Sequence, residues 1–428
     1  MKLKVLACVT TMTILAVLAL PPQCLAEARD QKLPQYTVVD LGTLGGTFSE
    51  TQGDNALGGE WVTGDSGLPN DTVLHAFLWH RGRIRDLGTL GGPNSFGWGV
   101  NESGNAVGGA DTSANDPLGE QYCFGAGDNS ICLPFLWRND IHKMIALPLL
   151  GGNNGAASGI NSQGEVVGQA ENANIDQTCV GTGSTQVLLI EAALWRNGKV
   201  HQLALIPGDA EGSAFAINDW GQVVGATSFG FCAAPEHAVL WQNGTAIDLG
   251  NLGGMNDNEA YAINDWGQVV GKSDVSGDTT FHAFLWRNGW MTDLGTLSND
   301  SASIAFGISN TGQVVGNSYN ASGNPRGFLW QWGVMTDLNT LIPSDSPLYL
   351  LTANGINDWG QIAGIAYESS SGEYHAYLAT PGCGEAGSEN TTAAATERPR
   401  ATLPENARKL LQRGALVGRI KGGLRTTQ

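Results

Sequence analysis

The sequence has few charged residues, and basic residues are the scarcest. Charged residues make up 14% of the chain, with 22 Lys and Arg against 40 Asp and Glu. Between Glu27 and Cys383 the imbalance is larger, with 36 acidic and 12 basic residues and a formal charge of −24. Binding to phosphate backbones or anionic lipid requires clustered basic side chains. The composition therefore argues against nucleic acid and anionic lipid as partners of this region.

Motifs of the common enzyme classes are also missing. The chain contains no Gly-x-Ser-x-Gly elbow, no His-Glu-x-x-His pair and no phosphate-cradling loop. The calcium-loop pattern of alternating Asp that ends in Glu is absent as well. We therefore assign no catalytic residue, no cofactor and no metal site. Glycoside hydrolysis stays open, since it needs only two carboxylates.

Long apolar runs are confined to the N-terminus. Lys2 and Lys4 precede an apolar run over Val5–Leu20, and small residues follow at Cys24–Ala26. This pattern is typical of a signal peptide, which we assign to residues 1–26 with cleavage after Ala26. No later stretch is long enough to span a bilayer. We expect a secreted or periplasmic protein without a transmembrane segment in the mature chain.

Cysteine is sparse, and five of the seven cysteines remain after cleavage. Cys123 and Cys132 fall in one loop, so we expect them to form a disulfide in an oxidising compartment. Cys179 and Cys232 fall in equivalent loops of neighbouring repeats, and we expect a second disulfide between them. Cys383 is left over, free or intermolecular.

What the chain does have is a repeat. The element Gly-x-Val-Val-Gly recurs with spacings of 60, 57, 46, 45 and 48 residues. A worn first copy lies near Gly59, and the others begin at Gly104, Gly164, Gly221, Gly267, Gly312 and Gly360. A period of this length suits a propeller blade better than a helical repeat of about 34 residues. Because each repeat cannot bury its apolar face alone, the repeats must stack.

Each copy contains two hairpins. In one of them, Ala216–Asn218 leads through Asp-Trp-Gly into Gln222–Gly225. In the other, His282–Trp286 leads through an Asn-Gly turn into Met291–Leu294. Asn-Gly favours the hairpin turn whose central residues have positive φ. The alternation predicts four antiparallel strands, A to D, in each copy.

The ends of the repeat region predict a ring. The chain opens with a lone D-type strand at Tyr36–Gly42 and ends with a C-type strand at His375–Leu378. The first strand would complete the last blade and leave only short, protected edges. We therefore predict an all-β fold, a closed seven-bladed β-propeller over residues 27–383. Six or eight blades, or an open stack, are the alternatives.

The string His-Ala-Phe-Leu-Trp, followed by Asp-Leu-Gly-Thr-Leu-Gly-Gly, runs from His75 to Gly92 and returns in worn form from His237 and His282. It resembles the HAF-repeat family of extracellular bacterial proteins. The resemblance covers residues 36–380 and implies a secreted repeat protein, with no established reaction. Two copies depart from it, with Leu133-Pro134 and Glu191-Ala192 in place of His-Ala.

A functional site must use residues that the repeat does not need. We expect the recurring histidines (His75, His237, His282 and His375) to be structural, with hydrogen bonds to strand backbone. In a four-stranded blade the A–B and C–D turns lie on one face of the disc. Trp220, Trp266 and Trp359 share one position there. We expect each indole to fold onto its neighbour; alternatively, the indoles stack on sugar rings or anchor a protein partner.

The opposite face carries the B–C loops, two of them long and each containing cysteine. Long loops on a rigid scaffold commonly carry function. Carboxylates in the nearby crossings could line the channel mouth and attract a cation, but we expect them to be solvated; these are Asp209, Glu211, Asp257, Glu259 and Asp300.

Composition changes again after the last repeat. Residues 384–428 form an expected linker and tail with eight basic and four acidic residues. We interpret the whole chain as a secreted, non-catalytic protein that binds a glycan or a protein at the cell surface. An extracellular polysaccharide hydrolase or lyase with its site at the channel mouth is one alternative, and a structural envelope or matrix protein is another.

Overall fold

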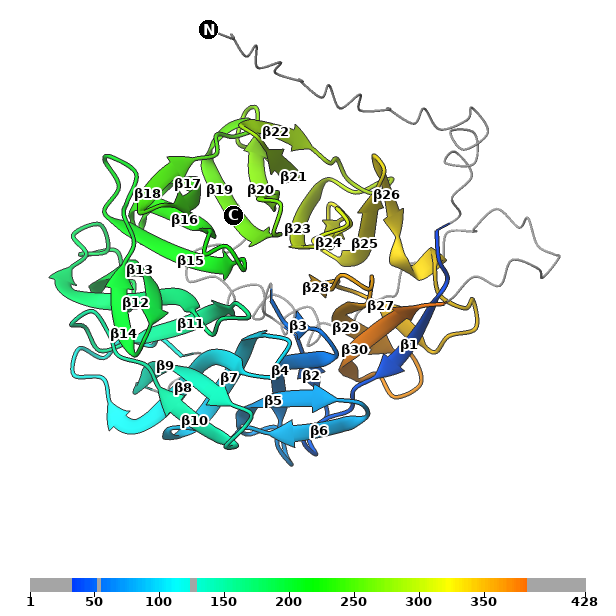
Figure 1. Cartoon of the computed structure of the whole chain (residues 1–428), viewed down its shortest axis with the longest axis horizontal. Helices are drawn as coiled ribbons and strands as arrows, with labels where there is room; N and C mark the ends of the chain where they lie inside the picture. The colour runs from blue at the N-terminus through cyan, green and yellow to red at the C-terminus, as the bar shows by residue number, and fades with distance from the viewer. Residues whose placement is uncertain (1–32, 52–54, 124–128, 383–428) are drawn as a thin grey trace, which may run out of the picture. The chain divides into compact units, whose positions relative to one another are not determined.

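A computed structural model describes residues 33–51, 55–123 and 129–382. The expected signal peptide, Cys383 and the tail from residue 384 lie outside these ranges. The described chain forms seven antiparallel sheets, each with a four-stranded path, around a central axis (Figure 1). Its one helical element is the short 3-10 turn η1 (Leu338–Thr340). The predicted seven-bladed β-propeller is therefore confirmed. No helix among the described residues is long and apolar enough to cross a membrane.

The first four blades follow chain order, each from its inner strand A to its outer strand D. Blade 1 contains β2 (Ser49–Glu50), β3 (Leu57–Gly58), β4 (Trp61–Gly67), β5 (Leu74–His80) and β6 (Arg83–Asp86). Blade 2 contains β7 (Gly91–Val100), β8 (Ala106–Asn115), β9 (Ser130–Arg138) and β10 (Lys143–Ala146). Blade 3 contains β11 (Gly155–Ile160), β12 (Val166–Ile175), β13 (Leu188–Arg196) and β14 (Lys199–Gln202). Blade 4 contains β15 (Glu211–Ile217), β16 (Val223–Gly230), β17 (Ala233–Gln242) and β18 (Thr245–Asp248).

The last three blades continue in the same sense. Blade 5 contains β19 (Gly253–Ile263), β20 (Val269–Val275), β21 (Phe281–Arg287) and β22 (Trp290–Asp293). Blade 6 contains β23 (Ala302–Ile308), β24 (Val314–Tyr319), β25 (Pro325–Gln331) and β26 (Val334–Asp337). Blade 7 contains β27 (Leu348–Leu350), β28 (Gly355–Ile356), β29 (Ile362–Glu368), β30 (Tyr374–Pro381) and, as its outer strand, β1 (Tyr36–Asp40).

The two ends of the described ring meet in blade 7. Strand β1 pairs antiparallel with β30, with Tyr36 opposite Pro381 and Val38 opposite Ala379. The blue and orange strands lie side by side in Figure 1. Blade 7 also contacts blade 1, because the Ala376 N–H donates to Ser49 Oγ over 3.0 Å. Strand β1 thus covers the outer edge of β30 and becomes the outer strand of blade 7.

The Gly-x-Val-Val-Gly repeat has a steric origin. Its final glycine lies on strand B, where strand A shifts register by one residue, as between Ala214 and Ala216. A Cβ added at Gly225 would overlap the carbonyl oxygen of Ser213 on strand A. The equivalent glycines of the other blades face the same obstacle: Gly64, Gly108, Gly168, Gly271, Gly316 and Gly364. Only glycine allows this close approach of two backbones.

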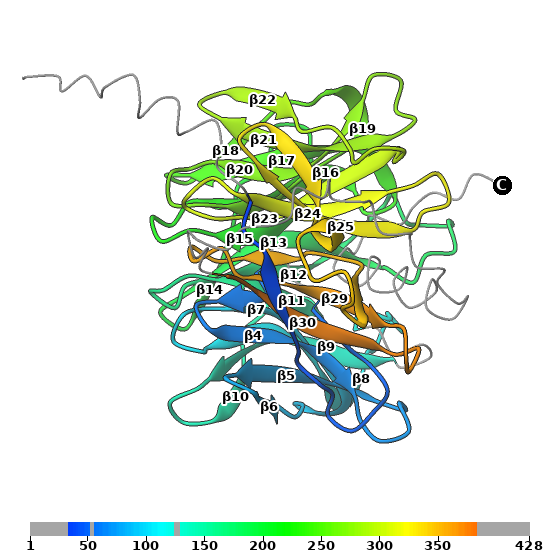
Figure 2. The same cartoon turned by 90° about the vertical axis from the view of Figure 1, so that its right-hand side faces the viewer.

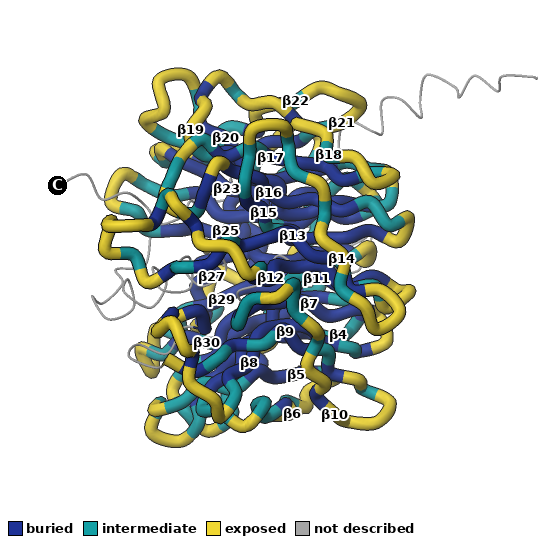
Figure 3. Tube along the Cα trace, turned by 90° about the vertical axis from the view of Figure 1, so that its left-hand side faces the viewer, coloured by how far each residue is buried: buried dark blue, intermediate teal, exposed yellow. Residues whose placement is uncertain are grey.

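The core lies between blades rather than within them. One apolar cluster joins Val224 and Leu240 of blade 4 to Ala260, Val269 and Phe284 of blade 5. Tryptophans of strand C take part in the core: Trp137, Trp195 and Trp241 are buried. Figure 3 shows the inner strands mostly buried and the connections exposed at both sides of the disc, while outer strands such as β14 and β22 are largely exposed. Each blade thus covers the apolar face of its neighbour.

Asparagines join the inner ends of neighbouring blades. The Asn161 side-chain amide donates to the Asn218 carbonyl over 3.2 Å, and Asn218 donates to Asn264 over 3.0 Å. Asn264 continues to the Ser309 carbonyl over 3.0 Å. Blade 6 has Ser309 at this position and lacks the amide, while in blade 7 Asn357 donates to Gly59 of blade 1 over 2.9 Å.

The recurring histidines are structural, but their partners differ from our prediction. His75 Nδ1 lies 2.9 Å from Asp86 and His282 Nδ1 lies 2.9 Å from Asp293, both carboxylates of strand D. The predicted backbone partners are wrong, because the strand D aspartate of the repeat lies directly beside the ring. Blade 6 has Arg326 in place of the histidine, and its guanidinium lies 3.0 Å from Asp337.

Candidate functional site

The strand order places connections on two opposite faces, which Figure 2 shows edge-on. We call the side with the A–B and C–D turns the turn face. The side with the B–C loops and the crossings from strand D to the next blade is the loop face. Residues predicted to form a site lie on both faces, so each face is considered separately.

The turn face carries five exposed tryptophans. Trp220, Trp266 and Trp359 occupy the A–B turns of blades 4, 5 and 7, and their exposed fractions are 77%, 77% and 62%. Trp290 and Trp332, in C–D turns of blades 5 and 6, are 77% and 60% exposed. The expectation that each A–B indole folds onto its neighbour is contradicted for Trp220 and Trp359 by their exposure, whereas the Trp266 indole N–H does bond the neighbouring turn. Sequence reasoning did not single out the C–D pair.

Backbone capping fixes the turns that present these rings. Asn218 Oδ1 accepts from the Trp220 N–H over 3.1 Å and from the Gln222 N–H over 2.9 Å. Asn264 and Asn357 cap the other two turns in the same way. Trp266 also donates its indole N–H to the Asn310 carbonyl of blade 6 over 3.0 Å, while its ring remains exposed. The rings are thus held on rigid turns, as the local Asn motif requires.

Hydrogen bonds from backbone to side chain join the neighbouring A–B turns. Asp265 Oδ1 accepts from the Asp219 N–H over 3.1 Å. Asn310 Oδ1 accepts from Asp265 N–H over 2.8 Å, and Asp358 Oδ1 accepts from Asn310 N–H over 2.7 Å. This chain crosses blades 4 to 7. It places acceptor lone pairs beside the rings.

The loop face contains a small pocket over blade 4. Its empty volume, including space open to solvent, is about 370 Å³. Glu211, Glu236 and Glu259 supply carboxylates to its lining, and Phe215 and Phe231 supply aromatic walls. The pocket therefore combines negative charge with apolar surface.

The structure brings together only some of the predicted carboxylates. Glu211 and Glu259 both line the pocket, and Asp257 forms a cluster with Glu236 and Glu259 in which ligand atoms lie within 4.8 Å. Asp209, in contrast, lies 2.9 Å from His237 Nδ1. Asp300 is fully buried and lies 3.2 Å from Arg326 Nη2. Asp209 and Asp300 are thus structural partners. The expectation that the carboxylates are solvated is wrong for four of the five, because the side chains of Asp209, Glu211, Glu259 and Asp300 are buried.

Sequence reasoning missed Glu236 and Lys272. The Lys272 side chain is 1% exposed, and its Nζ lies 2.5 Å from Asp257 and 3.2 Å from Glu259. The available signal was the repeat itself, since blade 4 has Ala226 at the equivalent position. Lys272 supplies the positive charge that a metal ion would otherwise bring to this cluster.

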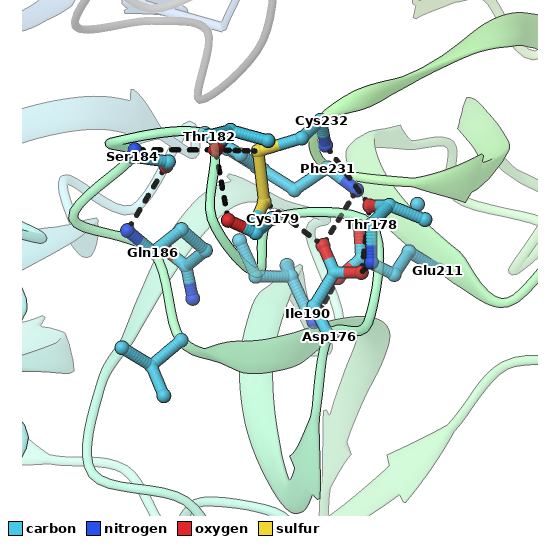
Figure 4. Close-up of a disulfide and its surroundings, with 12 residues drawn as sticks. Asp176, Thr178, Cys179, Thr182, Ser184, Gln186, Ile190, Glu211, Phe231 and Cys232 are labelled. Carbon is cyan, nitrogen blue, oxygen red and sulfur yellow. Dashed lines mark hydrogen bonds between the residues drawn. A yellow bond between two sulfur atoms is a disulfide. The ribbon is translucent and has the colours of Figure 1, made fainter.

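Both predicted disulfides are present. Cys123 of the blade 2 loop is bonded to Cys132 on β9, with Cα atoms 5.3 Å apart. Cys179 and Cys232 join blade 3 to blade 4, with Cα atoms 5.0 Å apart (Figure 4). Beside the second bond, Asp176 Oδ2 accepts from the Phe231 N–H over 3.0 Å. The loop face is thus cross-linked between blades.

No protein-family model and no curated protein sequence matches the chain. Among solved structures, it is similar to the β-propeller domain of the Trilobed protease from Pyrococcus furiosus, with 12% identity, a TM-score of 0.43, and coverage of 65% of this chain and 80% of that one. It is also similar to dipeptidyl peptidase 4 from Porphyromonas gingivalis, with 11% identity, a TM-score of 0.38, and coverage of 71% of this chain and 48% of that one. A third similar structure is a gluconolactonase from Xanthomonas campestris, with 12% identity, a TM-score of 0.34, and coverage of 82% of this chain and 96% of that one. Likeness at this level carries no argument about activity.

Proposed function

We propose that this protein is a secreted, non-catalytic propeller of the HAF-repeat type that binds an uncharged glycan at the cell surface through its turn face. The observation that carries the proposal is the set of five exposed tryptophans on that face. Two disulfides support an oxidising, extracytoplasmic location. The large negative charge of the body disfavours polyanionic glycans by repulsion.

The chemistry of the turn face fits a sugar ligand. A flat indole held on a rigid turn offers a large apolar surface at little entropic cost. Asp219, Asp265 and Asp358 lie in the same turns as, or next to, these indoles and offer acceptors for hydroxyl groups. A protein partner would also use aromatic anchors, but carboxylates beside every A–B indole favour a hydroxyl-rich ligand.

The test is binding of the secreted protein to a glycan array, followed by calorimetry on the best ligand. Substituting Trp220, Trp266 and Trp359 by Ala should weaken binding at least about 30-fold for each ring in contact, which corresponds to about 2 kcal/mol. Phe229→Ala is the matched control, since this aromatic is 56% exposed on the loop face. Unchanged affinity of the triple variant would eliminate the turn face as the site.

The pocket on the loop face supports one alternative function, hydrolysis of a polysaccharide. Glu211 and Glu259 converge there, as a glycosidase with two carboxylates would require. Release of shorter sugars from a bound polysaccharide, abolished by Glu211→Gln, would favour the hydrolase. Binding without product release favours the glycan-binding protein.

A further inference from the structure

Three acidic side chains are buried together beneath the loop face. Asp116 and Glu120 lie in the loop that follows β8 of blade 2, and Glu171 lies on β12 of blade 3. Asp116 is 6% exposed, and Glu120 and Glu171 are fully buried. All three approach the side-chain amide of Asn154, with Nδ2 at 2.9 Å from Asp116, 3.5 Å from Glu120 and 3.2 Å from Glu171.

The orientation of this central amide is fixed. Asn154 Oδ1 accepts from the Cys132 N–H over 3.0 Å, so its Nδ2 group must face the carboxylates. A second amide bridges the same groups, because Gln186 Nε2 lies 3.2 Å from Glu120 Oε1 and 3.0 Å from Glu171 Oε1. The neutral side-chain amides of Asn154 and Gln186 therefore donate the hydrogen bonds that link the three carboxyl groups.

Glu120 connects the two long loops directly. Its Oε1 accepts from the backbone N–H of Val187 over 2.7 Å and of Leu188 over 2.9 Å, at the end of the blade 3 loop. Glu171 Oε2 accepts from the Asn154 N–H over 2.9 Å, just before β11. The cluster thus ties the blade 2 loop to the blade 3 loop and to the inner strand of blade 3.

No ion pair among the described residues joins Asp116, Glu120 or Glu171 to a basic side chain. Tyr122 of the blade 2 loop is a further acidic group beside Glu120 and Glu171 among the described residues, and Glu211 of β15 also lies near Tyr122. Three ionised carboxylates cannot share one buried site without a compensating charge or proton.

We propose that Glu120 and Glu171 share one proton, and that this proton locks the two long loops of the loop face together. Loss of the proton leaves two adjacent carboxylates that repel each other across the loop junction. The loops then separate as pH rises. Burial and, after it, the charge of Glu120 raise the pKa of Glu171 to about 7, which supports release near neutral pH. Burial also raises the pKa of Glu120.

The test is hydrogen exchange of the full protein, read by mass spectrometry on peptides 116–123 and 176–188. Protection, corrected for the intrinsic exchange rate, is compared at about pH 5.5 and about pH 8.5. We expect protection in the wild type to fall at least about tenfold at the higher pH. Glu171→Gln should keep its protection at both values, because the amide N–H₂ replaces the shared proton as a donor to Glu120.

Glu60→Gln is the matched control, since Glu60 lies on the turn-face side beside Arg81 and should leave the pH response unchanged. Equal protection of the wild type at both pH values would overturn the proposal, as would a pH response that survives in Glu171→Gln. Calcium chloride and a chelator form the last arm. Restoration of protection by calcium at high pH would assign the compensating charge to a cation and refute the shared proton.

Discussion

Replacing Lys272 by Met removes a buried positive charge from blade 5 while keeping most of the side-chain volume. The Lys272 ammonium lies 2.5 Å from Asp257 Oδ2 and 3.2 Å from Glu259 Oε2, and 5.5 Å from the centre of the Phe281 ring. Met fills the path of the aliphatic stem, so the cavity it leaves is small. The substitution therefore tests charge rather than packing.

Burial sets the size of the expected effect. The side chains of Lys272 and Glu259 are 1% and 3% exposed, so water cannot replace the lost partner. Breaking such a pair costs about 3–5 kcal/mol, against about 0–1 kcal/mol for a surface pair. We expect Lys272→Met to lower the free energy of unfolding by about 3–5 kcal/mol at neutral pH.

The assay is urea unfolding followed by tryptophan fluorescence. Adding Glu259→Gln to Lys272→Met should recover part of the stability, because the more deeply buried of the two uncompensated carboxylates becomes neutral while an oxygen still accepts from the Tyr261 hydroxyl. Arg81→Met is the matched control: it breaks an ion pair with Glu60 whose side chains are 72% and 43% exposed, so little change is expected.

Two results would refute this reasoning. A loss of less than about 1 kcal/mol in Lys272→Met would mean that water reaches Glu259. A double variant as unstable as Lys272→Met would mean that the loss comes from packing and not from the buried charge.

Two further predictions concern cross-links in the ring. Replacing Cys179 and Cys232 by Ser should lower the free energy of unfolding by about 4 kcal/mol, and replacing Cys123 and Cys132 should lower it by about 3 kcal/mol. The reason is loop entropy, because the first bond closes a loop of 53 residues and the second a loop of only 9. Urea unfolding that gave the reverse order would contradict this argument. At His375, the hydrogen bond to Asp40 raises the pKa of the imidazole. This contact between β1 and β30 therefore stabilises the fold fully at a pH below the ordinary histidine pKa. Its contribution is lost as the pH rises through the raised pKa. Amides of β1 (Tyr36–Asp40) should therefore lose corrected exchange protection above neutral pH in the wild type, and His375→Gln should show little pH response; an equal response would contradict the assignment.

The repeat made the architecture predictable. The signals that specify a blade are local: the glycine at position 225 and its equivalents, the Asn-Gly turns and the alternating strands. Each copy of the repeat therefore contains the information that predicts its own four strands. The disulfide between Cys179 and Cys232 was predictable for the same reason, because equivalent loops of adjacent blades must lie close together.

The partners of individual side chains were harder to predict. The histidine at position 282 bonds Asp293 and not strand backbone, and the sequence alone does not rank a carboxylate above a carbonyl. The acids at 120 and 171 meet only because a long loop of one blade reaches the next, and no local pattern links residues so far apart.

The exposure of Trp220 shows a different limit. A turn position fixes the backbone of the residue, whereas the fate of its indole depends on the gap between adjacent turns. Here Asp265 accepts a hydrogen bond from the backbone of the Trp220 turn, and the indole stays exposed.

The most direct test of the proposed function is fluorine NMR of protein labelled with fluorotryptophan, titrated with the glycan selected on the array. The chain contains 13 tryptophans, so their resonances can be assigned by single substitution. We predict shifts for Trp220, Trp266 or Trp359, with the buried Trp137, Trp195 and Trp241 unchanged. Saturable binding that shifts none of the five exposed turn-face tryptophans would contradict the account.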